Sequence, residues 1–348
     1  MHAFLKLGVW GVCCGLPPAT NTPNSSFRYV GGKIGPYMNT STHPATARLT
    51  RGYLISFIGV LFWSTTGIFI RYLTVEYNMP SLPLTFWRDF AVAIALVGVL
   101  LLVRPALLKI DRRWLLFMAL YGLLLAVFNS IWTFSVALNG ASVATVLAYS
   151  SPAFTAFLSW RLMGEKLSAL KIGVIVVSMI GSALVAGAYD PANWRLNPWG
   201  IVVGLLTGLF FALYSLMGKH ASDHGLNSWV TLAYSFSFAA LFLLFINLGA
   251  DLLRGMGPGS ELLWLGDEYM GWIVLFILGV GPTIGGFGLY SLSLDYLKPT
   301  VANLIATLEP VLTFVMAFFL LGEQLNPGQI VGGLLIIGSV ILLRLREG

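Results

Sequence analysis

The segment ATLEPVLTFVMAFFLLGEQL, residues 306–325, places one carboxylate, that of Glu309, inside an apolar run long enough to cross a membrane. A charged side chain at the centre of a bilayer costs about 2.5–3.5 kcal/mol on insertion scales, so Glu309 is expected to face the protein interior, to be protonated or to be paired. As an acid it could carry a proton, and as an anion it could bind an amine. We predict that Glu309 lines a central cavity and binds substrate or a proton. A hydrogen bond that only holds helices together is the structural alternative.

Arg88 and Asn303 are further polar residues inside predicted membrane spans. Arg88 precedes Asp89 in LTFWRDFAVAIA and lies near enough to the outer surface to reach the headgroups; alternatively it contacts a substrate or counter-ion. An intramembrane amide such as that of Asn303 or Asn129 can hold helices together or bind a solute. Arg88 and Asn303 are therefore candidate binding residues, with contacts between helices as the more ordinary role of the asparagines.

Four aromatic residues lie deeper in the predicted spans than an aromatic belt at the headgroups would place them: Trp63, Trp132, Tyr149 and Tyr290. Pockets for organic ligands are lined largely by apolar and aromatic side chains. We predict that these four residues form cavity walls, and packing between helices is the alternative.

Pro152 and Pro310 fall near the middle of two predicted spans. Proline has no backbone N–H, so the carbonyls of Ala148 and Ala306 lose their helical donors. Unpaired backbone at membrane depth is tolerated where it faces protein or a wet cavity. These prolines therefore predict kinks in helices that line a pathway, or kinks that serve packing alone.

The composition requires that these residues be carried by membrane-spanning helices. The chain is 57% hydrophobic and only 10% charged, and the backbone of long apolar runs can satisfy its hydrogen bonds in lipid by forming helices. We predict an all-α membrane protein with ten transmembrane helices, over residues 53–73, 84–103, 114–137, 142–162, 169–187, 198–219, 229–249, 271–292, 301–321 and 327–345.

Lys and Arg are distributed unequally between the two sides that these spans define, and cytoplasmic loops carry the excess of positive charge. With the N-terminus inside, the cytoplasmic segments hold Arg48, Arg51, Arg104, Lys109, Arg112, Arg113, Arg161, Lys166, Lys171, Lys219, Lys298, Arg344 and Arg346, and the opposite face holds Arg71, Arg195 and Arg254. We predict that both termini are cytoplasmic in a cell (inner) membrane. The net charge of +6 then reflects topology and not nucleic-acid binding.

Residues 1–50 are rich in Asn, Ser, Thr, Pro and Gly and are predicted to be a disordered tail, with Met38 as an alternative start. The cysteines, Cys13 and Cys14, are adjacent in this tail and indicate neither a disulfide framework nor a metal site. His220, Asp223 and His224 have a spacing that suits a metal, but they follow a span in a predicted cytoplasmic loop. No metal site is expected.

The chain contains an internal repeat. Six residues recur at the same spacing, namely Ala148, Pro152, Thr155, Gly164, Glu165 and Leu167 as Ala306, Pro310, Thr313, Gly322, Glu323 and Leu325. The Gly–Glu pairs follow a span in each half and are typical of a helix terminator. We predict two repeats of five helices, 51–188 and 189–348, and an odd number of spans makes the second repeat inverted, a plan common in secondary transporters.

The doubled proline, followed about a dozen residues later by Gly-Glu-x-Leu in a chain of ten short-looped spans, resembles the EamA-type transporters of the drug/metabolite transporter superfamily. The resemblance covers about residues 50–345. It implies ten helices around a central cavity and small organic solutes as substrates. A Glu-Pro pair in the ninth helix, here Glu309 and Pro310, is also common in that family.

Three classes of function compete for such a chain. A secondary transporter accounts for the inverted repeat, the prolines and the sparse intramembrane charges together. An intramembrane enzyme would need a reactive constellation, and the sequence contains no G-x-S-x-G, H-E-x-x-H or Walker motif. A scaffold would not account for Glu309. We expect export of an amino acid or related metabolite by alternating access, with multidrug efflux as the alternative; the partners are the bilayer and a small-molecule substrate, without a cofactor.

Overall fold

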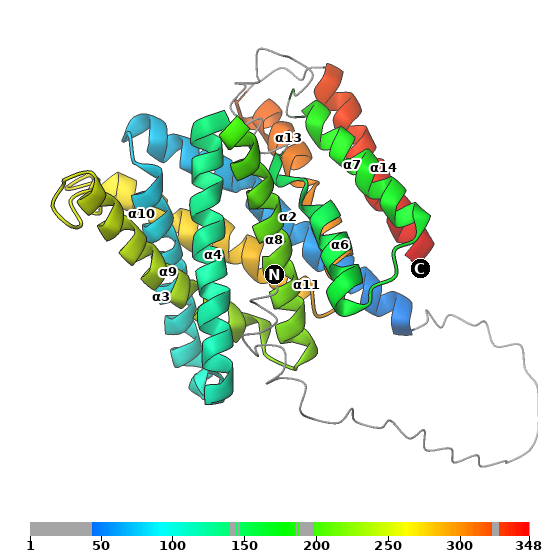
Figure 1. Cartoon of the computed structure of the whole chain (residues 1–348), viewed down its shortest axis with the longest axis horizontal. Helices are drawn as coiled ribbons and strands as arrows, with labels where there is room; N and C mark the ends of the chain where they lie inside the picture. The colour runs from blue at the N-terminus through cyan, green and yellow to red at the C-terminus, as the bar shows by residue number, and fades with distance from the viewer. Residues whose placement is uncertain are drawn as a thin grey trace, which may run out of the picture. The chain divides into compact units, whose positions relative to one another are not determined.

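The computed structural model describes residues 44–139, 144, 147–185, 187, 198–321 and 327–347. Ala45–Gly348 forms one compact unit. Within these described residues every regular element is a helix (Figure 1). In chain order they are α2 (Pro44–Glu76), α3 (Ser81–Val103), η1 (Pro105–Leu108), α4 (Arg112–Asn139), α6 (Ser151–Met163), α7 (Ala169–Val185), α8 (Pro198–Asp223), α9 (Ser228–Leu253), α10 (Tyr269–Leu278), η3 (Gly279–Thr283), α11 (Ile284–Ser293), α12 (Pro299–Ala306), α13 (Glu309–Leu321) and α14 (Pro327–Glu347).

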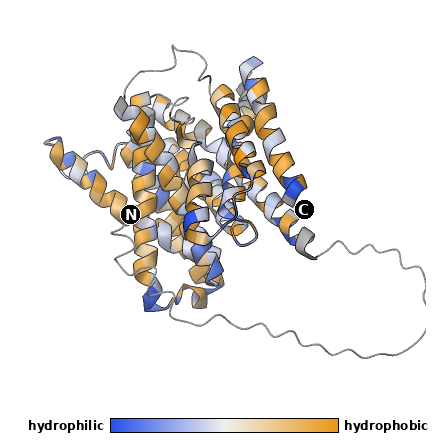
Figure 2. Cartoon of the chain, turned by 45° about the vertical axis from the view of Figure 1, so that its right-hand side comes forward, coloured by the Kyte–Doolittle hydropathy of each residue, from blue (hydrophilic) through white to orange (hydrophobic). Residues whose placement is uncertain are grey.

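Seven stretches of the described chain are long and apolar enough to cross a membrane: Ala47–Glu76, Ser81–Val103, Arg112–Trp132, Trp199–Asp223, Ser228–Leu253, Tyr269–Ser293 and Pro327–Arg346. Figure 2 shows that most of the helices consist largely of hydrophobic residues. Many large apolar side chains, such as Leu102 and Leu253, are exposed. In water such a surface would be unfavourable, but lipid tails can cover it. The all-helical membrane class is confirmed, while the count of ten spans stays a prediction.

The other three predicted spans are shorter or interrupted. α7 is an apolar helix of 17 residues, below the roughly 20 that a typical bilayer core requires. In the fourth predicted span, Tyr149 and Ser150 form a turn directly before α6, and in the ninth, Thr307 and Leu308 form a turn between α12 and α13. The two turns occupy corresponding positions of the sequence repeat.

A proline lies in the first turn of the helix that follows each interruption. Pro152 is the second residue of α6 and Pro310 the second of α13. This is where proline fits a helix best, because the N–H that it lacks would have no helical partner there. The prolines therefore begin new helices after the turns.

The eighth predicted span is also irregular. Between α10 and α11 the backbone forms a π-helix that contains Pro282, a local widening of the kind that often marks functional segments. The segment packs closely on α3, because a Cβ atom at Gly279 would lie 3.1 Å from the carbonyl oxygen of Arg88.

α7 and α14 lie side by side (Figure 1). They cross at two glycines, since a Cβ atom at Gly332 would come within 2.5 Å of the carbonyl oxygen of Gly181. Small residues let helix backbones approach each other in this way in membranes.

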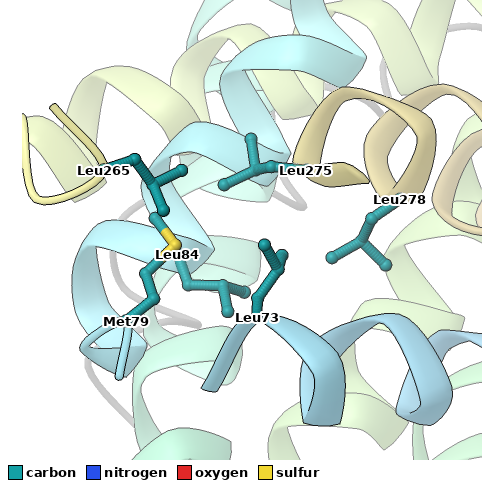
Figure 3. Close-up of a cluster of buried hydrophobic side chains, with 6 residues drawn as sticks. All are labelled: Leu73, Met79, Leu84, Leu265, Leu275 and Leu278. Carbon is teal, nitrogen blue, oxygen red and sulfur yellow. The ribbon is translucent and has the colours of Figure 1, made fainter. Parts of the chain in front are cut away.

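The connection between α2 and α3 is packed against α10 and the segment before it. Six buried apolar side chains gather there, as Figure 3 shows: Leu73, Met79, Leu84, Leu265, Leu275 and Leu278. The indole of Trp264 donates a hydrogen bond over 2.8 Å to the carbonyl oxygen of Tyr77. This end of the bundle is therefore held by both apolar packing and hydrogen bonds.

Two helices extend into segments that were predicted to be a tail or a loop. α2 begins at Pro44, so residues 44–50 are helical and not a disordered tail; residues 1–43, with Cys13, Cys14 and Met38, lie outside the described residues. α8 continues to Asp223, so His220 and Asp223 lie on a helix and not in a loop.

Candidate functional site

The two interrupted segments meet through Glu309 and Tyr149. The Tyr149 hydroxyl donates a hydrogen bond over 2.9 Å to Glu309 Oε2. Tyr149 belongs to the first turn described above, and Glu309 is the first residue of α13, directly after the second turn. Both side chains are half-buried. The carboxyl group of Glu309 is therefore paired with a hydroxyl from the other interrupted segment.

Asn303 connects three helices beside this pair. The Ser151 hydroxyl, at the start of α6, donates over 2.8 Å to Asn303 Oδ1. Asn303 Nδ2 donates over 3.2 Å to Ser215 Oγ on α8. All three residues are buried. Because buried polar groups are costly unless they are paired, this chain of hydrogen bonds fixes the relative positions of α6, α12 and α8.

Ser215 continues the chain to an aromatic cluster. Ser215 Oγ lies 2.6 Å from the hydroxyl oxygen of Tyr290, which is fully buried on α11. The Tyr290 ring lies 5.1 Å from that of Trp63 on α2, and Trp63 also meets Phe287 edge-on at 5.0 Å. Phe211 on α8 completes the cluster, 5.6 Å from Tyr290. The aromatic cluster of Trp63, Phe211, Phe287 and Tyr290 thus adjoins the polar chain.

Three of the four predicted aromatic residues belong to these contacts. Tyr149 binds Glu309, while Trp63 and Tyr290 pack on each other. Trp132 on α4 is half-buried and takes no part in them.

Arg88 pairs with a carboxylate of its own helix, whereas a binding role would require its guanidinium to face a solute. Its guanidinium Nη2 lies 3.0 Å from Asp89 Oδ1, and Asp89 Oδ2 accepts a hydrogen bond over 2.7 Å from Asn129 Nδ2 on α4. All three residues are buried. The guanidinium is neutralised by its neighbour on the same helix, so the structure does not join Arg88 to the group around Glu309.

Sequence reasoning did not select Ser215, although it connects Asn303 to Tyr290. The one signal was a hydroxyl inside an apolar span, and serines are common there because they can bond their own helix. Ser215 does so as well, donating to the carbonyl oxygen of Phe211 over 2.8 Å.

α8 lies unusually close to the interruption before α6. A Cβ atom at Gly208 would overlap the Ser150 hydroxyl and lie 3.0 Å from the carbonyl oxygen of Ala148. On the other side, Thr313 on α13 donates to the carbonyl oxygen of Ser64 on α2 over 3.3 Å. Both interrupted segments are thus held between neighbouring helices.

A carboxyl group beside a hydroxyl can exchange a proton or bind a cation. Glu309 is an acceptor beside the Tyr149 hydroxyl, whereas Asn303 and Ser151 already bond to each other. No three His, Cys, Asp or Glu side chains are grouped to hold a metal in the part of the chain that the structure describes.

Comparison with known proteins agrees with this picture. The sequence model of the EamA-like transporter family matches residues 50–187 and again residues 198–345. The chain is 25% identical to an uncharacterized transporter of Clostridium kluyveri over 309 residues, which are 84% of this chain and 93% of the relative. It is 23% identical to an uncharacterized inner membrane transporter of Salmonella typhimurium, over 85% of this chain and 95% of the relative.

The fold matches as well. One protein of known crystal structure superposes with a TM-score of 0.69 over 85% of this chain and 97% of its own, at 18% sequence identity. Since the family model matches the chain twice and the two matches together span most of its length, the chain belongs to the EamA-like transporter family and is a membrane transporter of the drug/metabolite type.

Proposed function

We propose that the protein is a secondary transporter that moves a small organic solute by alternating access, with its binding site between the fourth and ninth membrane segments. One observation carries the proposal. The Tyr149–Glu309 hydrogen bond joins the interruptions of those two segments. Interrupted helices near the midplane are the usual frame of binding sites in transporters with inverted repeats, because the turns expose backbone groups and helix ends to a solute.

The helix ends at the two interruptions differ in charge. α13 carries an acidic residue, Glu309, in its first turn, whereas α6 has none. The positive end of the α13 dipole is therefore compensated, while that of α6 carries no acidic residue and would favour an anion once α8 moves away from Ser150 and Ser151. A carboxylate at α6 and an amine at Glu309 would suit a zwitterion, and this supports an amino acid or a related metabolite as the solute.

In this proposal the two repeats move relative to each other. We assign them to residues 51–188 and 189–348, each with five spans and inserted in opposite senses. The two family matches and the corresponding positions of the two turns support this arrangement. Both termini lie in the cytoplasm in this proposal, and the direction of transport is export.

Multidrug efflux is the second candidate. The aromatic cluster of Trp63, Phe211, Phe287 and Tyr290 favours it, because large apolar solutes stack on such rings. A drug pump would recognise solutes without a free carboxylate, whereas the amino acid proposal requires one.

Metabolite profiling of cells with and without the protein, followed by uptake into proteoliposomes, tests both candidates. We expect one or a few amino acids or close derivatives to change in the medium, and the purified protein to transport them. Transport of apolar cations alone would favour multidrug efflux. No changed solute and no transport by purified protein of normal fold would overturn the transporter proposal.

A further inference from the structure

Glu165 lies outside the site just described, in the short connection between α6 and α7. It follows Gly164, whose φ of +69° ends α6 in a left-handed conformation that suits glycine. The helix terminator predicted for this pair is present, while Gly322 and Glu323 lie outside the described residues. Glu165 itself is only 8% exposed, which a terminator alone would not require.

Two buried side chains bind the Glu165 carboxylate. Lys171 Nζ, near the start of α7, lies 2.7 Å from Oε1. The Thr300 hydroxyl, near the start of α12, donates to Oε2 over 2.9 Å. A buried ion pair gains little unless its remaining lone pairs are satisfied, so the Thr300 hydroxyl completes the site.

The Glu165–Thr300 contact connects the two repeats. Glu165 and Lys171 belong to residues 51–188, whereas Thr300 belongs to the second repeat. In the repeat alignment Lys171 corresponds to Gln329, so the cation is present in the first repeat only. Glu165, Lys171 and Thr300 all lie near segment ends on the predicted cytoplasmic side.

Other contacts close the same end of the bundle. The connection between α11 and α12 is held by Lys219 Nζ, which donates to the carbonyl oxygen of Leu294 over 2.9 Å. A cavity lined by Tyr121, Tyr214 and Ser291 has a water-accessible volume of only about 10 Å³. This is room for about one water molecule. An organic solute could not pass there without a rearrangement.

We infer that Glu165, Lys171 and Thr300 form the latch of the cytoplasmic gate, and that the Glu165–Thr300 hydrogen bond must break whenever the protein opens to that side. The inference rests on the proposed function, because alternating access requires the two repeats to separate at each end in turn. The Glu165–Lys171 pair remains intact within the first repeat. It keeps the carboxylate in position to accept the Thr300 hydrogen bond when this side closes again.

The test measures opening directly and needs no substrate. A single reporter cysteine is introduced as Ala306→Cys, at the buried end of α12, after Cys13 and Cys14 are replaced by serine. Its rate of labelling by a membrane-impermeant maleimide is compared in inside-out and right-side-out vesicles. Thr300→Val removes the hydrogen bond without unpairing Lys171. Because a hydrogen bond to a charged group is involved, we expect labelling from the cytoplasmic side to rise about tenfold or more.

Thr300→Ser is the matched control, since it keeps the hydroxyl and should label as slowly as the parent. Lys166→Gln, at an exposed neighbour of Glu165, should also leave the rate unchanged. Equal rates for Thr300→Val and Thr300→Ser would overturn the latch, and so would a rise that is equal from both sides of the membrane, which indicates general loosening. A protein that shows the latch but transports no solute would contradict the proposed function instead.

Discussion

The hydroxyl of Tyr149 and the carboxylate of Glu309 lie 2.9 Å apart although 160 positions separate them in the sequence. Each residue is at an interruption of a predicted membrane segment. The hydrogen bond therefore joins the two places where the backbone is irregular. A substitution of either side chain should alter the structure at both interruptions.

Glu309→Gln is expected to abolish or strongly reduce transport while the protein still folds, because glutamine keeps the shape of the side chain but cannot carry a proton or a negative charge. Loss of a charged hydrogen-bond partner corresponds to about 1.5–3 kcal/mol, or roughly ten- to a hundredfold in affinity. Uptake of the identified solute into proteoliposomes, measured across a range of pH, checks this. Glu261→Gln, at an exposed ion pair with Arg254, is the control. Unchanged kinetics at every pH would leave Glu309 with a structural role only.

Tyr149→Phe removes the donor to Glu309 and leaves the ring in place. If the hydrogen bond positions the carboxylate, transport should weaken less than in Glu309→Gln, and the double variant should be no worse than Glu309→Gln alone, because coupled residues are not additive. The measurement is the transport rate of both single variants and the double variant. Additive losses would show that the two side chains act independently.

Asp89→Asn should destabilise the protein markedly, because it leaves the Arg88 guanidinium buried without a counter-charge. Removing one partner of a buried pair costs about 3–5 kcal/mol. Asp111→Asn, which breaks the exposed pair with Arg113, should cost at most about 1 kcal/mol. The thermal unfolding temperature in detergent distinguishes them. A similar small change in both variants would mean that Arg88 is neutralised by another group.

Much of the fold could be predicted from the sequence, because the solvent dictates it. Runs of apolar residues in lipid must be helical, and the spans that correspond to α3 and α9 were predicted to within a few residues of their observed ends. The turns at Tyr149 and Thr307 were not predicted. Proline marks a loss of helical hydrogen bonds, but whether the helix bends or restarts depends on neighbours such as α8, which the sequence pattern does not identify.

Part of the candidate site could be selected from the sequence for the same reason. Glu309 and Asn303 were selected because polar groups are costly in lipid, and the structure brings both to the interrupted segments. Their partners could not be identified. Ser151 and Ser215 are small hydroxyl residues that bond either their own helix or another, and only packing decides which. Arg88 was selected on cost alone, and its neighbour Asp89 pairs with it.

The membrane orientation can be tested at Gly257, in the connection between α9 and α10. This residue is exposed, and nothing lies within 4 Å of a Cβ atom placed there, so Gly257→Cys should fold normally. In cysteine-free background it should be labelled from outside the cell, while a tag after Gly348 should be accessible only from the cytoplasm. Labelling of Gly257→Cys from the cytoplasmic side alone would refute the orientation and the ten-span count together.

Gly208→Ala tests whether the interruption before α6 depends on the close approach of α8. In an unconstrained helix, replacing glycine by alanine is favourable by up to about 1 kcal/mol. At Gly208 the new methyl group would overlap the Ser150 hydroxyl and lie 3.1 Å from the Ser151 backbone nitrogen, so α8 would have to move away. We expect a net loss of about 1–3 kcal/mol, as in other overpacked interiors.

Gly98→Ala on α3 is the matched control for that change, because no atom lies within 4 Å of its added methyl group. Its unfolding temperature in detergent should stay the same or rise, whereas that of Gly208→Ala should fall. Adding Ser150→Ala to Gly208→Ala removes the nearest clashing atom and should restore part of the loss, because the two changes share one contact. The remaining loss then measures the strain against the backbone of Ala148 and Ser151. Equal unfolding temperatures for Gly208→Ala and Gly98→Ala would show that α8 does not determine where the fourth segment is interrupted.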